Sequence, residues 1–151
     1  PSARPEAPHR AWPIPARVRE APLTAGGGRV LFTGDAAWAT DPLTGEGIAQ
    51  ALVTGRRAAE AVLHEATPAG VANRYERAVR HELFADHWLG ALLSRGLSHR
   101  KGARIAIRAA GLHPWTRRNF ARWLFEDYPR AVIGTPRRWS RGMFRAPGAY
   151  R

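Results

Sequence analysis

The sequence contains no cysteine, one methionine (Met143) and one lysine (Lys101) among its 151 residues. The missing thiols exclude disulfides, thiolate metal ligands and cysteine nucleophiles, and they are compatible with a reducing cytoplasm. No apolar run approaches the roughly 20 residues that span a bilayer, and no secretory signal pattern opens the chain. We therefore expect a cytoplasmic protein, either free or attached peripherally to a membrane. Because the chain starts at Pro1 and has a single internal methionine, we also expect it to be part of a longer protein.

Acidic residues are scarce in the last third of the chain. Residues 1–96 carry 11 arginines and 10 acids, a net charge of +1, whereas residues 97–151 carry 13 basic residues and two acids, a net charge of +11. Such a basic region attracts phosphates, an anionic membrane surface or nucleic acid, unless it is simply a solvated surface. No helix-turn-helix, zinc-finger or RNA-binding signature is present, so nucleic acid is the least favoured of these partners.

Six of the twelve prolines lie in residues 1–28, which predicts an extended connector. Three glycines, Gly26 to Gly28, then predict a tight turn, because no Lys-Ser or Lys-Thr follows to make a phosphate-binding loop. Residues 29–33 (RVLFT) contain three consecutive large apolar residues, which favours a short strand covered on both faces. A single strand cannot pair its own backbone groups, so we expect the rest of its sheet to lie elsewhere.

A polar loop follows this strand and leads into a helical pattern. Gly34 permits a positive φ or a close approach of the backbone to a ligand. Asp35 places a carboxylate at the edge of a core, where it either caps a neighbouring turn or accepts hydrogen bonds from sugar-like hydroxyls. The glycines before Ile48 leave the first amide groups of the following helix free to face an anion.

This loop resembles a flavin-contacting motif. The stretch Gly-Asp-Ala-Ala at residues 34–37, followed by Asp-Pro-Leu-Thr-Gly-Glu-Gly-Ile at residues 41–48, resembles the second FAD-contacting motif of flavoprotein oxidoreductases, most closely the geranylgeranyl reductase family. The match covers about residues 29–66, and Trp38 departs from it, since the family more often has a small residue or His there. The resemblance implies that FAD is bound by Gly34, Asp35, Ala36, Pro42, Gly45, Glu46, Gly47 and Ile48.

The resemblance also implies a reaction, which is hydride transfer from reduced FAD to a C=C bond of an isoprenoid lipid, with NAD(P)H as one conceivable electron donor. It implies that Asp35 holds the ribityl chain of FAD. The Gly-x-Gly-x-x-Gly fingerprint for the ADP half of the cofactor is absent, so we expect this chain alone to bind FAD poorly. No catalytic residue can be assigned. The spacing of Asp35, Asp41 and Glu46 fits no standard metal motif, so we expect no metal site.

Four helices are expected. The first begins at Ile48 and ends at about residues 64–65, before Pro68, and its apolar face is formed by Ile48, Ala51, Leu52, Gly55, Ala59, Val62 and Leu63. The others cover residues 70–95, 101–110 and 114–126. In the second helix we expect a polar surface face formed by His81, Glu82, Asp86 and His87.

The predicted fold class is α/β: the C-terminal part of an FAD-binding Rossmann-like domain, with one strand, the Gly-Asp loop and a long helix, followed by a mostly α-helical tail. We divide the chain into a connector from a missing substrate domain (1–28), the FAD-domain segment (29–66) and a basic helical region (67–151), through which membrane contact would occur. Two alternatives to the reductase stay open. One is an FAD-dependent aromatic-ring monooxygenase, and the other is a basic helical module that binds anionic lipid or nucleic acid without flavin.

Overall fold

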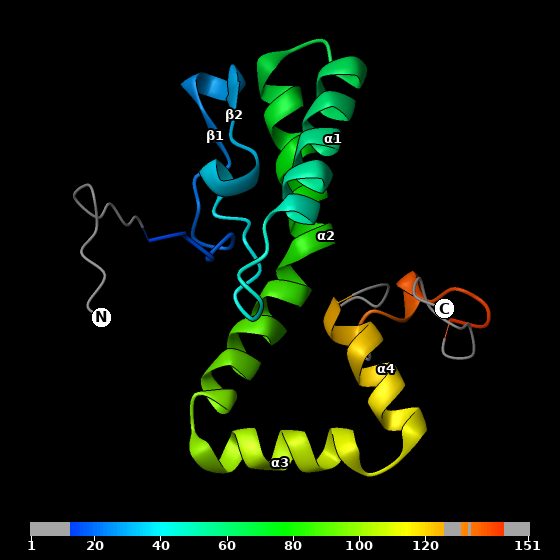
Figure 1. The fold of residues 1–151 in the computed structure, drawn as a ribbon. Helices are drawn as coiled ribbons and strands as arrows, with labels where there is room; N and C mark the ends of the chain where they lie inside the picture. Colours follow the sequence, from blue (N-terminus) through cyan, green and yellow to red (C-terminus); the bar gives the residue numbers. More distant parts are fainter. Residues whose placement is uncertain (1–12, 126–130, 133, 144–151) are drawn as a thin grey trace, which may run out of the picture.

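The computed structural model describes residues 13–125, 131–132 and 134–143. These residues form four α-helices and one two-stranded antiparallel sheet (Figure 1). The helices are α1 (Ile48–His64), α2 (Pro68–Leu97), α3 (Arg100–Gly111) and α4 (Pro114–Phe125). All four predicted helices are therefore confirmed. The parallel sheet of a Rossmann-like domain is not among the described residues, and of residues 1–28 only 13–28 are described.

The predicted strand at residues 29–33 is much shorter than expected. Only Val30–Leu31 form β2, which pairs with β1 (Thr24–Ala25) in an antiparallel hairpin. The three glycines make its turn as a 3-10 helix with positive φ angles of 59°, 66° and 91°, which confirms the predicted tight turn. Val30 is exposed, so the prediction of a strand buried on both faces was wrong. The apolar run supplies one side of a hairpin instead, with Phe32 N–H donating to Leu23 O at 2.9 Å.

The hairpin is fixed to the long helix α2. The Tyr75 hydroxyl donates to the Phe32 carbonyl, and Thr24 donates to the Glu76 carboxylate at 2.8 Å. Tyr75 is fully buried, and this burial raises the pKa of its hydroxyl to about 12, so the group stays a donor at neutral pH. These bonds join residues more than 40 positions apart in the sequence.

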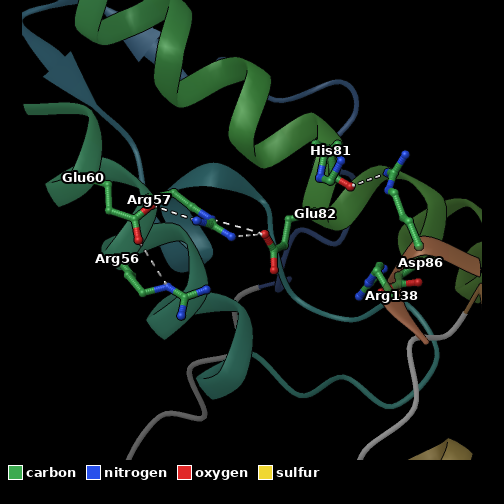
Figure 2. A network of polar contacts seen from close by, with 8 residues as sticks. Arg56, Arg57, Glu60, His81, Glu82, Asp86 and Arg138 are labelled. Carbon is green, nitrogen blue, oxygen red and sulfur yellow. Dashed lines mark hydrogen bonds and ion pairs between the residues drawn. The ribbon is translucent and has the colours of Figure 1, made fainter. Parts of the chain in front are cut away.

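Helices α1 and α2 form an antiparallel pair (Figure 1), and α2 extends two residues beyond its predicted range at each end. Proline at the first position of α2 and the Thr67 hydroxyl, which accepts from Gly70 N–H at 3.1 Å, define the start of α2. Arg57 of α1 contacts the Glu82 carboxylate of α2 at 2.5 Å and Glu60 of its own helix at 2.7 Å (Figure 2). These hydrogen bonds, to Glu60 and then Glu82, raise the pKa of Arg57 above its usual value.

The buried face of α1 differs from the predicted one. Thr54 and Ala61 are buried, with Val53 and Ala58 partly buried, whereas Ile48 is 81% exposed and Leu63 is 80% exposed. The helical period was right, but the predicted apolar face points to solvent within the described part of the chain. Small residues at the contact let α1 lie close to α2, and this decides which face is buried.

One cluster of buried side chains lies between the hairpin, the Gly-Asp loop, α1 and α2. Residues from all three predicted segments, 1–28, 29–66 and 67–151, contribute to this cluster. It consists of Val18, Leu23, Ala37, Ala39, Ala61, Tyr75, Val79 and Leu83. The second half of α2 continues beyond this core and turns into α3 and α4 (Figure 1). None of the described helices is long and apolar enough to cross a bilayer.

The segment after α4 returns to α2. Asp86 accepts a hydrogen bond from Ala131 N–H at 2.8 Å. It also pairs with Arg138 at 2.8 Å, and Figure 2 shows both side chains. Asp86 and Glu82 therefore bind other parts of the chain, which corrects their assignment to a free polar surface face.

Candidate functional site

The Gly-Asp loop begins with a 3-10 turn, Gly34–Ala37, held tightly to α1. Gly34 has φ +54°, and a Cβ added there would lie 3.1 Å from the Ala51 Cβ, so both its conformation and its packing favour glycine. Its buried N–H donates to the Thr54 hydroxyl at 2.9 Å. The positive φ predicted for Gly34 is confirmed, and its close neighbour is α1 of the same chain. The approach of its backbone to a ligand stays a prediction.

Asp35 points from this turn toward the start of α1. Its residue is exposed, and its Oδ1 accepts the Thr40 hydroxyl at 2.9 Å. The same oxygen lies 3.2 Å from the position that a Cβ on Gly47 would take. Gly47 is the residue that precedes α1, so the carboxylate and the first turn of that helix converge.

The first turn of α1 has no side-chain cap among the described residues. Its first regular backbone bond runs from Ala51 N–H to Gly47 O at 2.8 Å, so the amide groups of residues 48–50 precede the helical hydrogen-bond ladder. These donors carry the positive end of the helix dipole. A carboxylate acceptor and a set of amide donors therefore lie side by side, an arrangement that suits a ligand with hydroxyl groups and an electron-rich edge.

The middle of the loop is braced from within by Asp41. The buried Asp41 carboxylate accepts hydrogen bonds from Leu43 N–H at 2.7 Å and Thr44 N–H at 3.4 Å. The backbone N–H of Asp41 donates to Glu46 O at 2.8 Å. Asp41 is thus structural, as turn-forming aspartates commonly are. Pro42 packs on α2, where a Cβ added to Gly90 would lie 3.0 Å from Pro42 Cγ.

The remaining predicted site residues lie on the outer side of the loop. Ala36, Gly45, Glu46 and Ile48 are exposed, and Gly45 adopts φ +75°. No group of three or more potential metal ligands occurs within residues 13–125, 131–132 and 134–143. The geometry thus brings Asp35 and Gly47 together directly, while Pro42 has a packing contact with α2.

His87 of α2 forms a hydrogen bond with the Gly-Asp loop. It is buried, and one ring nitrogen, Nε2, lies 3.0 Å from the Ala39 carbonyl oxygen, so this nitrogen carries the proton. Burial lowers the pKa of His87, outweighing the hydrogen bond to Ala39 and the nearby charges of Asp41 and Asp86. The prediction that His87 lies on a surface face was therefore wrong.

The sequence did not predict the contacts that Thr54 and His87 make with the loop. A usable pattern exists for His87, because the buried positions of α2 are Tyr75, Val79, Leu83, His87 and Gly90, spaced by four, four, four and three residues. Thr54 lies one turn from Ala58 and two turns from Ala61 on the buried face of α1. Both polar residues continue an apolar stripe, which is where a buried partner of the loop belongs.

Comparison with known proteins gave no match to this chain, either among family models, curated proteins or solved structures.

Proposed function

We propose that this chain supplies the flavin-contacting loop of an FAD-dependent oxidoreductase. The observation that carries the proposal is the convergence of the exposed Asp35 carboxylate with the uncapped start of α1, 3.2 Å from the Cβ position on Gly47. The motif resemblance predicted this pairing from residues a dozen positions apart. The fit is to one half of the cofactor, because the fingerprint for the ADP half is absent from the sequence.

In this proposal Asp35 accepts hydrogen bonds from the ribityl hydroxyls of FAD, and the amide groups of residues 48–50 face the pyrimidine edge of the flavin. Thr40 holds the carboxylate in place through its 2.9 Å hydrogen bond. Gly45 and Gly47 allow the backbone to approach the ring without side chains in the way. Bound FAD supplies the redox chemistry itself, as cofactors do, and a reductive reaction on an isoprenoid C=C bond with NAD(P)H as donor is the form that the motif favours.

The proposal is tested on the full-length protein, purified and examined for flavin absorbance. We expect a yellow protein that an electron donor bleaches under anaerobic conditions and that reduces an isoprenoid substrate. Oxygen consumption coupled to hydroxylation of an aromatic substrate would reassign the enzyme as a monooxygenase. A colourless protein that cannot be reconstituted with FAD would reject flavin binding altogether.

A second function, contact with an anionic membrane surface, is favoured by helix α3. None of its residues is buried; Ile105 is 68% exposed and Ile107 is 73% exposed. Four basic residues and no acid share this helix: Arg100, Lys101, Arg104 and Arg108. Exposed aliphatic side chains among basic ones are typical of helices that lie in the headgroup region of a bilayer.

Vesicle co-sedimentation tests this second function. We expect binding to vesicles that contain phosphatidylglycerol, weaker binding to pure phosphatidylcholine, and loss of binding in the Ile105→Ser variant. Equal binding to both vesicle types would contradict attraction of α3 to anionic lipid. Tight, salt-sensitive binding to nucleic acid and none to vesicles would favour a basic helical module that binds nucleic acid.

A further inference from the structure

A largely apolar pocket of about 630 Å³ lies among α2, α3, α4 and the segment that follows α4. Its walls include Trp88 and Leu89 of α2, Ala106 of α3, and Trp115, Phe120 and Trp123 of α4. Helices α3 and α4 and the second half of α2 occupy the lower half of the molecule in Figure 1, away from the hairpin. The volume falls in the range of small-molecule sites, roughly 300–1,000 Å³.

The pocket walls suit an apolar ligand body. Their two polar side chains already bond within the chain: the Thr116 hydroxyl donates to His113 O at 2.7 Å, and Asn119 Nδ2 donates to Trp115 O at 2.9 Å. The aromatic walls are also accessible, since Trp88 is 55% exposed. Clustered, exposed aromatic side chains on a concave surface are typical of a ligand-binding site.

The pocket is distinct from the Gly-Asp loop, although both touch the same turn of α2. His87 and Gly90 face the loop, through Ala39 O and Pro42, whereas Trp88 and Leu89 face the pocket. Successive residues of a helix are rotated by about 100°, so the helix itself separates the two sites. A ligand in the pocket therefore does not occupy the space beside Asp35, and the inference does not depend on flavin binding.

The charge of the two helices that line the pocket favours an anionic head group, although no basic side chain is part of the lining. Helices α3 and α4 carry seven basic residues and no acidic one. All of them except Arg122 are exposed: Arg100, Lys101, Arg104, Arg108, Arg117 and Arg118. Two helices that enclose an apolar space and present only positive charge to solvent are complementary to an anionic amphiphile. We propose that this pocket binds the chain of a single-chain anionic amphiphile such as a long-chain fatty acid, whose carboxylate is attracted by the net positive charge of α3 and α4.

Titration calorimetry on the full-length protein tests this, with laurate and dodecyltrimethylammonium as probes, both kept below their critical micelle concentrations. The two probes have the same chain length and opposite charge. We expect saturable binding of one laurate, at least tenfold weaker binding of the cation, and a laurate affinity that decreases with added salt. Absence of saturable laurate binding, or equal affinity for both probes, would overturn the proposal.

Variants on one helix locate the binding. Ala106→Phe fills the pocket and should weaken laurate binding at least tenfold, whereas Ile107→Phe, at the neighbouring position outside the pocket lining, should change it less than threefold. Ala109→Phe, at an exposed position of the pocket wall, gives a second occluding variant that does not crowd a buried core. If neither occluding variant weakens binding while circular dichroism shows both folded, laurate binds elsewhere and the proposal fails.

Discussion

Replacing Thr54 by valine removes the hydrogen bond that fixes the Gly-Asp loop to α1. The Thr54 hydroxyl is fully buried, accepts from Gly34 N–H at 2.9 Å and donates to Gln50 O at 2.8 Å. Valine keeps the volume of the side chain but leaves the buried Gly34 N–H without its acceptor. A buried polar group that loses its partner costs about 1–3 kcal/mol.

For a chain of this length, 1 kcal/mol corresponds to a shift of about 2–4 °C in Tm. We therefore expect Thr54→Val to lower Tm by about 2–12 °C and the free energy of unfolding by about 1–3 kcal/mol, measured by circular dichroism with heat and urea. Thr44→Val is the matched control, because the Thr44 hydroxyl accepts only a long 3.4 Å bond from Glu46 N–H at an exposed site. A loss below about 0.5 kcal/mol in Thr54→Val, the usual range of surface substitutions, would refute the role assigned to this hydroxyl.

Three other contacts can be tested by substitution. Gly28 has φ +91°, and Gly28→Ala would place a Cβ 2.1 Å from a backbone oxygen of α2, so this change should lower the free energy of unfolding by about 2–5 kcal/mol. Gly27→Ala, where the space is open, should lower it by only about 1–2 kcal/mol. Similar losses for the two variants in urea titrations would contradict the close contact at Gly28. Because burial lowers the pKa of His87, the contribution of this residue to the free energy of unfolding should be fully present above the unfolded pKa of about 6.5 and be lost as the pH falls below it. The urea midpoints at pH 7.5 and 5.5 should therefore differ more in the wild type than in His87→Gln. Arg57→Ala breaks a partly exposed ion pair with Glu82, so it should cost no more than about 1 kcal/mol, and 0.5 M salt should reduce the difference; a larger, salt-independent loss would show that packing dominates there.

Helix positions could be predicted from the sequence because their ends depend on local chemistry. Pro68 and Pro114 each open a helix, and the threonine before Pro68 provides a cap. The helix ends need only neighbours in the sequence. The convergence of Asp35 with the start of α1 is instead implied by the resemblance to the flavin-contacting motif, which assigns both groups to one cofactor.

Burial could not be predicted in the same way, because it depends on which surfaces meet. The apolar run at residues 29–33 suits a two-sided strand as well as one side of a hairpin, and the choice depends on the distant contact from Tyr75. The large residues of α1 formed a convincing apolar face, yet the small residues of that helix pack on α2. His87 was assigned to the surface by its type, although its position in the helical stripe placed it in the interior.

The most direct test of the central claim is the FAD affinity of the full-length protein with and without the Asp35 carboxylate. A hydrogen bond to a charged group is worth about 1.5–3 kcal/mol, so Asp35→Ala should raise the Kd for FAD roughly 10- to 150-fold. Glu65→Ala is the control, since it removes the same charge just after the opposite end of α1. The account predicts a large loss of affinity in Asp35→Ala and none in Glu65→Ala, and equal FAD affinity in all three proteins would contradict it.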